Sequence, residues 1–311
     1  MATKSVAMRM AFGEGLLELA GAVPEMVVLD ADVASSTQTL KFGMAHPSRF
    51  FNCGVAEGNM AAIAGGMATC GLRPVVSTFA LFIALKCADQ MRNVVCYNNL
   101  PVVFAANYAG LSDSFDGASH QSVEDLAFAR ALPNLTVVVP ADGVEVKQAL
   151  AQALRRDGPT YIRLGRNPTP VLFEGEPPLE IGRVRKLRDG ADVTICVCGV
   201  PTFMALDAAE RLAAEGMQAD ILEVATLKPL DAEAIAASAA KTGRVVTVEE
   251  HSIIGGLHGA VCEALSRWRP FPVAAVGIED RYAESGPYEA LMARYGISAE
   301  AIVARARGLA G

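Results

Sequence analysis

Short runs rich in valine and isoleucine alternate with longer runs of alanine, leucine and methionine along most of this chain. The short runs have the length and residue types of buried strands, and the longer ones carry apolar residues at helical spacing. This alternation is typical of parallel sheets covered by helices, and it predicts an α/β fold with doubly wound domains. The predicted strands are residues 26–29, 74–78, 102–106, 136–139, 161–164, 193–198, 219–224, 245–249 and 273–278.

The longer runs predict helices, and some of them begin at residues able to cap a helix. Ser122 and Asp142 are each followed three residues later by an acid, which is the arrangement of a capping box. The predicted helices are residues 5–20, 56–69, 82–97, 123–130, 143–155, 201–214, 232–240, 256–268, 287–293 and 299–307.

The alternation breaks once, between Asn167 and Gly190, where prolines and charged residues cluster. Such a stretch is typical of a connection between domains. We therefore predict a first domain over residues 1–167, a linker over 168–190 and a second domain over 191–311, and both domains have ordinary sizes.

The charge balance bears on the class of partner. The chain has 27 Lys and Arg residues against 34 Asp and Glu residues, a formal net charge of −7. No basic field is available to hold a polyanion, so neither nucleic acid nor an anionic membrane surface is expected as a partner.

Cysteine usage and the first residues bear on the compartment. The seven cysteines are an odd number, they form no CxxC pair, and most lie inside apolar runs. The first fifteen residues lack the long apolar segment of a secretory signal. A reduced, cytoplasmic chain is therefore expected.

Common catalytic and metal motifs are missing. Residues 13–18 begin like a dinucleotide-binding fingerprint, but Glu18 replaces the third glycine and the segment lies within a predicted helix. No P-loop, HExxH or GxSxG motif occurs. Glu249, Glu250, His251 and His258 lie close in sequence, yet their spacing matches no known ligand set, so no metal is expected on this chain.

Glu57 is the one acidic residue that stands out, because it is the only charge between Arg49 and Arg73. Two interpretations remain open. Backbone N–H groups at a helix start could satisfy the carboxylate. Alternatively, a desolvated carboxyl group could share a proton with a heteroaromatic nitrogen, which is what thiamine diphosphate requires for activation.

Several strings in fixed order resemble the transketolase family. They are GVAEGNMAAIAGGMA at 54–68, STFALF at 77–82, DGASHQ at 116–121, NLTVVVPAD at 134–142, YIRLGR at 161–166 and VVTVEEHSIIGGL at 245–257. The resemblance runs from about Ser5 to the end and covers the pyrimidine-binding and C-terminal domains of transketolases. The chain is most similar to the small subunit of split, two-chain transketolases.

This resemblance implies a thiamine diphosphate site. Glu57 falls on the cofactor-activating glutamate, which also makes it a catalytic residue. Phe79 and Phe82 fall on the aromatic positions that wall the aminopyrimidine, where core packing is the alternative interpretation. Asp32 matches an acid near the cofactor.

The resemblance also implies residues that contact the sugar. Asp116 matches a residue that binds substrate hydroxyls, and His120 matches one that helps proton transfer at the reacting carbons. Arg9, Ser36 and Arg166 match positions that bind the substrate phosphate, although both arginines could be ordinary surface residues.

Tyr108 departs from the family pattern. Transketolases typically carry a further phosphate-binding histidine eight residues before the aspartate that corresponds to Asp116, and this chain has Tyr108 there. Either the phosphate is held differently, or the donor is not the usual ketose phosphate.

Half of the expected cofactor site is missing from this sequence. Transketolases bind the diphosphate through Mg²⁺, which a GDG motif and a downstream asparagine hold, and no GDG occurs here. The resemblance therefore implies a partner subunit that carries this motif and most of the Mg²⁺ site, with an α2β2 heterotetramer as the expected assembly.

The function implied is the transfer of a two-carbon ketol unit from a ketose phosphate to an aldose, with a partner chain required for activity. One alternative is the β subunit of a 2-oxo acid dehydrogenase, which has less use for Asp116 and His120. Another is a noncatalytic subunit of a thiamine enzyme. The sequence does not identify the sugar.

Overall fold

The computed structural model describes residues 4–310, and in it six strands of the first half and one strand of the second form a seven-stranded sheet. Its strands are β2 (Met26–Asp30), β3 (Phe50–Asn52), β4 (Arg73–Phe79), β5 (Val103–Asn107), β6 (Thr136–Val138), β7 (Thr160–Arg163) and β12 (Thr226–Lys228). They lie in the order β12-β6-β7-β5-β4-β2-β3. All neighbours are parallel except β12 and β6.

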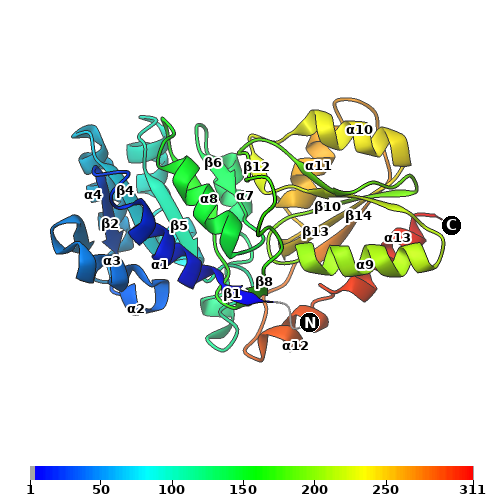
Figure 1. Ribbon diagram of the computed structural model, residues 1–311, viewed down its shortest axis with the longest axis horizontal. Coiled ribbons are helices and arrows are strands. Elements are labelled where there is room, and N and C mark those ends of the chain that lie inside the picture. The colour runs from blue at the N-terminus through cyan, green and yellow to red at the C-terminus, as the bar shows by residue number, and fades with distance from the viewer. Residues whose placement is uncertain (1–3, 311) are drawn as a thin grey trace.

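Helices cover both faces of this sheet (Figure 1). On one face, α1 (Met8–Leu19), α3 (Thr39–Ala45) and α8 (Gly143–Ala153) pack over Val28 of β2. On the other, α4 (Glu57–Thr69), α5 (Ala80–Lys86) and α7 (Asp125–Ala131) pack over Val27 and Leu29. Alternate residues of one strand thus enter opposite cores, as the pleat requires. The short helical segments are α2 (Ala34–Thr37), α6 (Ala88–Gln90), η1 (Pro47–Arg49), η2 (Met91–Cys96) and η3 (Gly117–Ser119).

The second half has its own five-stranded sheet. Its strands are β9 (Arg185–Arg188), β10 (Val193–Val197), β11 (Ala219–Glu223), β13 (Val245–Ser252) and β14 (Val273–Ile278), in the order β14-β13-β10-β11-β9 with only β9 antiparallel. One face is covered by α9 (Thr202–Ala214) and α13 (Ala299–Gly308), and the other by α10 (Ala232–Thr242) and α11 (Leu257–Leu265). The helix α12 (Tyr288–Arg294) follows β14.

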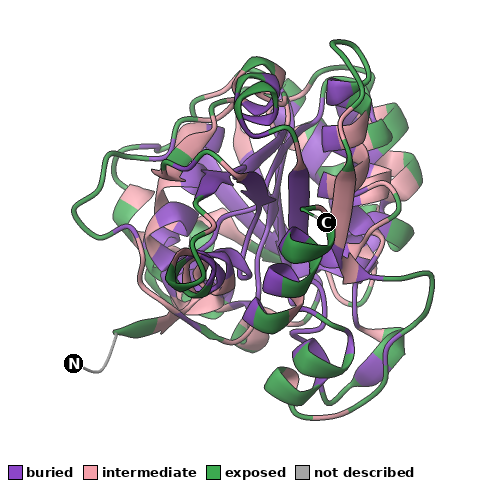
Figure 2. Cartoon of the chain, turned by 90° about the vertical axis from the view of Figure 1, so that its right-hand side faces the viewer, coloured by how far each residue is buried: buried purple, intermediate pink, exposed green. Residues whose placement is uncertain are grey.

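The fold class expected from sequence is confirmed. Each of the nine predicted strands has a counterpart in the two sheets, and the buried residues concentrate on these strands while the surrounding helices expose one side (Figure 2). Within residues 4–310, none of the helices combines the length and the apolar composition that a membrane span requires.

Some local predictions are wrong. The helix expected from residue 5 begins at Met8, because residues 5–7 form β1 (Ser5–Ala7), which pairs with β8 (Pro168–Pro170). The helix expected over 82–97 starts at Ala80 and divides into α5, α6 and the π-helical η2. Asp142 caps α8 by accepting from two backbone N–H groups, as predicted, whereas Ser122 does not cap α7.

The two halves share structure. β12 comes from the C-terminal half but completes the N-terminal sheet beside β6. One apolar core also runs from Val137 and Val139 to Leu222 and Val224. Residues 168–190 contain β8, paired with β1, and β9, which belongs to the second sheet.

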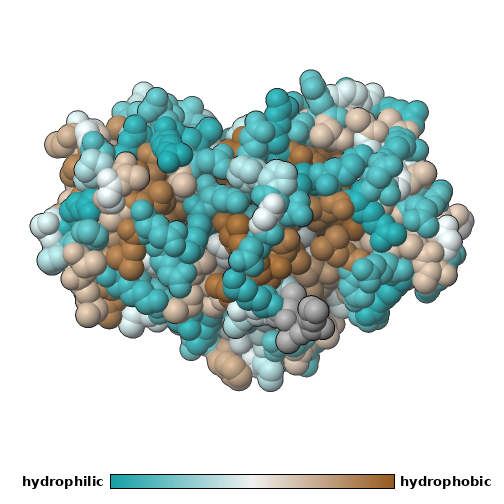
Figure 3. All heavy atoms as spheres, in the orientation of Figure 1, coloured by the Kyte–Doolittle hydropathy of each residue, from teal (hydrophilic) through white to brown (hydrophobic). Residues whose placement is uncertain are grey.

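The surface seen in the orientation of Figure 1 has hydrophobic residues between bands of hydrophilic ones (Figure 3).

Candidate active site

Glu57 begins α4, directly after the loop that follows β3. Gly54 adopts a φ of +70° in this loop and donates its N–H to Oδ1 of Asn52 at 3.0 Å. Asn52 in turn donates from Nδ2 to Oδ1 of Asp32 at 3.0 Å. The carboxylate of Asp32 is thereby held beside the chain that leads into Glu57, at the carboxyl ends of β2 and β3.

The Glu57 side chain is buried against Lys86 of α5. Only 6% of its area is exposed, and Nζ of Lys86 donates to its Oε1 at 2.9 Å. The same Nζ lies 3.7 Å from the centroid of the Phe82 ring, within reach of a cation–π interaction. Among the described residues, the partner found for the Glu57 carboxylate is thus the Lys86 ammonium group. Neither interpretation made from the sequence included this lysine.

An aromatic cluster adjoins this ion pair. The Phe79 and Phe82 rings lie 5.6 Å apart, and the His120 imidazole meets the Phe82 ring edge-on at 5.3 Å. Phe79 stacks on Tyr108 with 4.4 Å between centroids and 22° between ring planes. These separations suit aromatic pairs. The cluster provides a flat apolar surface next to Glu57.

Tyr108 joins the aromatic cluster to the predicted substrate residues. It has a φ of +61°, which a bulky residue rarely adopts, and its side chain is almost fully buried. Its hydroxyl accepts from Nη1 of Arg9 at 3.1 Å, and the same Nη1 donates to the Ser36 carbonyl at 3.2 Å. The Arg166 guanidinium lies 5.0 Å from the centre of the tyrosine ring. Arg9, Ser36 and Arg166 are therefore brought together around Tyr108.

Asp113 pairs with Arg166. Nη1 of Arg166 donates to Oδ1 of Asp113 at 3.0 Å, and the aspartate side chain has no exposed area. Burial raises the pKa of Asp113 to about 7; the nearby Asp116 adds to this rise, and Arg166 opposes it. Asp116 itself is exposed, just before η3, and His120 follows η3 with Nδ1 3.0 Å from the Ser119 hydroxyl.

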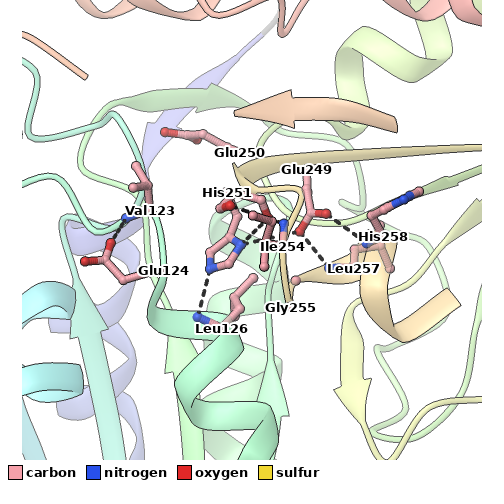
Figure 4. A network of polar contacts seen from close by, with 12 residues as sticks. Val123, Glu124, Leu126, Glu249, Glu250, His251, Ile254, Gly255, Leu257 and His258 are labelled. Carbon is pink, nitrogen blue, oxygen red and sulfur yellow. Dashed lines mark hydrogen bonds and ion pairs between the residues drawn. The ribbon is translucent and has the colours of Figure 1, made fainter. Parts of the chain in front are cut away.

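Among the acidic and histidine residues at 249–258, Glu250 and His251 contact the first half of the chain, whereas Glu249 bonds within the second (Figure 4). Glu249 accepts from the backbone N–H groups of Leu257 and His258, and Nε2 of His251 accepts from the N–H of Leu126 at 3.1 Å. Burial lowers the pKa of His251 to about 4, so its ring is neutral near pH 7. Glu250 accepts from the N–H of Leu111.

A buried ion pair lies beside these residues. Arg163 donates from Nε and Nη2 to the Asp125 carboxylate, which has no exposed area, and from Nη2 to the carbonyls of Ser122 and Glu250 at 3.0 Å. The Tyr161 hydroxyl also donates to Asp125 at 2.8 Å. Arg163 thus ties β7 and α7 of the first half to β13 of the second.

Metal ligands form no suitable group in the described part of the chain, where no three or more His, Cys, Asp and Glu side chains are arranged to hold an ion. The aromatic cluster and the Glu57 carboxyl fit the pyrimidine half of thiamine diphosphate, because they combine a flat apolar wall with an acid. The residues present do not fit the diphosphate–Mg²⁺ half.

The structure brings most of the predicted site residues into one connected group. Contacts run from Glu57 through Lys86 to the aromatic cluster and on to Tyr108 and the two arginines. Asp32 stands apart, linked through Asn52. Sequence reasoning missed Lys86 and Asp113. The signal for Lys86 was its position as the only charge between Arg73 and Asp89.

Comparison with known families gives two matches. The profile of the transketolase pyrimidine-binding domain matches residues 4–171, and that of the transketolase C-terminal domain matches residues 182–302.

Individual proteins are similar over nearly the whole chain. A putative transketolase C-terminal section of Methanocaldococcus jannaschii is 42% identical over 96% of this chain and 94% of its own length. A 6-deoxy-6-sulfo-D-fructose transketolase subunit of a Clostridium species is 38% identical over 93% of this chain and 89% of that protein. A solved structure described as a split gene transketolase, an inactive beta4 tetramer, superimposes with a TM-score of 0.90 at 45% identity and covers 98% of both chains.

Proposed function

The chain belongs to the transketolase family, and we propose that it is the subunit of a two-chain transketolase that activates thiamine diphosphate and transfers a two-carbon ketol unit from a ketose to an aldose. The observation that carries the proposal is the buried Glu57 carboxyl group beside the Phe79 and Phe82 rings. Thiamine diphosphate, when bound, supplies the nucleophilic carbon that cleaves the ketose.

Glu57 holds a proton at the ring nitrogen of the aminopyrimidine in this proposal. Its helix start and burial fix the carboxyl group in one position, and Phe79 and Phe82 exclude water from the ring. The Lys86 ammonium group donates to the Glu57 carboxylate and lies over the Phe82 ring. It must therefore move aside when the aminopyrimidine binds.

Sugar contacts fall to His120 and Asp116 in this proposal. His120 contacts the Phe82 ring edge-on and is placed to move a proton at the reacting carbons. Asp116 is exposed and able to accept from a sugar hydroxyl. These two residues favour a ketose over a 2-oxo acid, whose decarboxylation needs no contact with sugar hydroxyls.

A second chain completes the site in this proposal. The residues at 4–310 offer no group of acids and histidines suited to a metal, so the diphosphate and Mg²⁺ fall to a subunit that carries a GDG motif and a downstream asparagine. The similarity to a split gene transketolase supports a paired arrangement, for which an α2β2 heterotetramer is the simplest closed form.

The first experiment identifies that second chain. The tagged protein is purified from its native cells, and any protein present in equal amount is identified by mass spectrometry. The assembled pair is then assayed for ketose cleavage and for lipoamide reduction. Ketose cleavage supports the proposal, lipoamide reduction supports a 2-oxo acid dehydrogenase, and the absence of both supports a noncatalytic subunit.

Glu57→Gln tests the residue itself. We expect the assembled variant to retain the cofactor, measured by calorimetry, and to lose exchange of the cofactor C2 proton, measured by NMR in deuterated solvent. Glu210→Gln on α9 is the matched control, because Glu210 is exposed and belongs to the second half. Exchange at the wild-type rate in Glu57→Gln would remove Glu57 from the proposed role.

A further inference from the structure

Four side chains gather where β5 and β7 end, around Tyr108 of the aromatic cluster. Tyr108 follows β5, Arg166 follows β7, Arg9 comes from α1, and Asp113 lies beneath Arg166. The carboxyl edge of a parallel sheet is the usual place for a ligand. The family resemblance implies that the far end of the substrate, the end remote from the reacting carbons, binds at these residues.

The charge at this place is small. Two guanidinium groups, those of Arg9 and Arg166, face one carboxylate, that of Asp113, which has no exposed area and is 3.0 Å from Arg166. The net charge of the three groups is therefore +1 when Asp113 is ionised. Asp116 adds a second carboxylate near Asp113 and raises the pKa of Asp113.

Tyr108 limits the room and the donors. Its neutral ring lies 5.8 Å from the Arg9 guanidinium carbon and 5.0 Å from that of Arg166, and stacks on Phe79. Its hydroxyl and the Ser36 carbonyl share the Nη1 donor of Arg9. A bulky ring and an engaged donor leave fewer N–H groups for a ligand than two free guanidinium forks would.

One donor remains without a partner. Nε of Arg9 is buried and makes no hydrogen bond within residues 4–310. A buried donor without a partner costs free energy, so this atom points to a ligand that accepts from it.

We infer that this site binds the far end of a sugar substrate that carries a single negative charge, a carboxylate or a sulfonate, in preference to a phosphate dianion. The inference rests on the proposed ketol transfer and names its substrate class. At pH 8, where Asp113 is ionised, a phosphate ester carries a charge of about −2, which exceeds the charge of +1 that Arg9, Arg166 and Asp113 together offer. A group with one charge matches it and can still accept from Nε of Arg9.

The test compares substrates that differ only at the far end. The assembled two-chain enzyme is assayed at pH 8, where Asp113 is ionised, with xylulose 5-phosphate, with the analogues in which a sulfonate or a carboxylate replaces the phosphate, and with xylulose. We expect kcat/KM for one of the two singly charged ketoses to exceed those for the phosphate and for xylulose by about tenfold or more. The analogue with the higher kcat/KM shows whether the site prefers a sulfonate or a carboxylate.

Asp113→Asn tests the charge count. Asparagine can still accept from Arg166 but removes the negative charge, so kcat/KM for the phosphate should rise about tenfold relative to the singly charged ketose. Asp207→Asn, at a half-exposed position on α9, should leave this ratio unchanged. A ratio that stays within twofold in Asp113→Asn, or a wild-type preference for the phosphate or for xylulose, overturns the inference.

Calorimetry separates this inference from the proposed function. The assembled wild-type protein is titrated with ribose 5-phosphate and with its 5-sulfonate and 5-carboxylate analogues, which report binding without turnover. Tighter binding of a singly charged sugar with no ketose cleavage retains the inference and refutes ketol transfer. Ketose cleavage with a preference for the phosphate retains the proposed ketol transfer and refutes the inference about the singly charged group.

Discussion

Replacing Arg163 by methionine should destabilise the whole chain, because the change leaves a buried carboxylate without its charge partner. Asp125 has no exposed area and accepts from both Nε and Nη2 of Arg163 at 2.9–3.2 Å. Without Arg163 it keeps the Tyr161 hydroxyl, while His251 is too far for a hydrogen bond at 3.9 Å. The Ser122 and Glu250 carbonyls also lose a donor.

Breaking a buried ion pair on one side costs about 3–5 kcal/mol. At about 2.1 cal/mol/K of unfolding entropy per residue, the 311 residues give roughly 0.65 kcal/mol/K, so each kcal/mol lowers Tm by about 1.5 °C and a fall of roughly 5–8 °C is expected for Arg163→Met. Thermal unfolding of the isolated chain, followed by circular dichroism, measures it. The double variant Asp125→Asn with Arg163→Met should recover part of the loss, because no unpaired charge then remains buried.

Arg211→Met is the matched control. Arg211 also pairs with two carboxylates, those of Asp207 and Glu300, but on the exposed side of α9, where ion pairs contribute little. We expect no measurable change in Tm for this variant. A Tm for Arg163→Met within about 2 °C of wild type would refute the reasoning, since it would mean that the buried carboxylate finds another partner or a proton at little cost.

Two further predictions concern single carboxylates. Lys86→Met should lower the Kd of the assembled protein for thiamine diphosphate with Mg²⁺ about two- to fivefold. The aminopyrimidine ring then no longer has to break the half-exposed ion pair between Lys86 and Glu57 in order to bind. Weaker binding in calorimetry would contradict this. Burial raises the pKa of Glu145 from 4.5 to about 7, with Glu223 beside it. The raised pKa adds stability that is complete below about pH 4.5 and is lost as the pH rises through 7. Glu145→Gln should therefore flatten the dependence of Tm on pH between 5 and 8 and raise Tm at pH 8, and a steeper dependence would count against it.

The strands were predictable because burial on both faces leaves a continuous apolar run. β10 is an example, with all of its residues buried and Thr194 as its one polar residue. β12 was not predicted, because Thr226–Lys228 is short and polar and pairs only across the two halves. Ser122 failed as a cap because α7 begins at Asp125 with Glu124 in the cap position, and the Ser122 hydroxyl makes no hydrogen bond within residues 4–310.

The site was predictable in its residue types more than in its pairing. Glu57, Phe79 and Phe82 follow from the family strings, and the structure links them through Lys86 and the contact of the two rings. The partners Lys86 and Asp113 were missed, since each meets its counterpart through the packing of separate elements, 29 and 53 residues away. Patterns among neighbouring residues do not predict contacts between residues so far apart in the sequence.

The antiparallel pairing of β12 with β6 makes the two halves dependent on each other. A fragment that ends before Thr226 would leave β6 as an open edge with unpaired backbone groups, a template for aggregation. A fragment that ends before Leu222 would also remove Leu222 and Val224 from the core that supports Val137. The C-terminal half is therefore a structural requirement of the sheet that presents Phe79 and Tyr108, whatever chemistry it contributes itself.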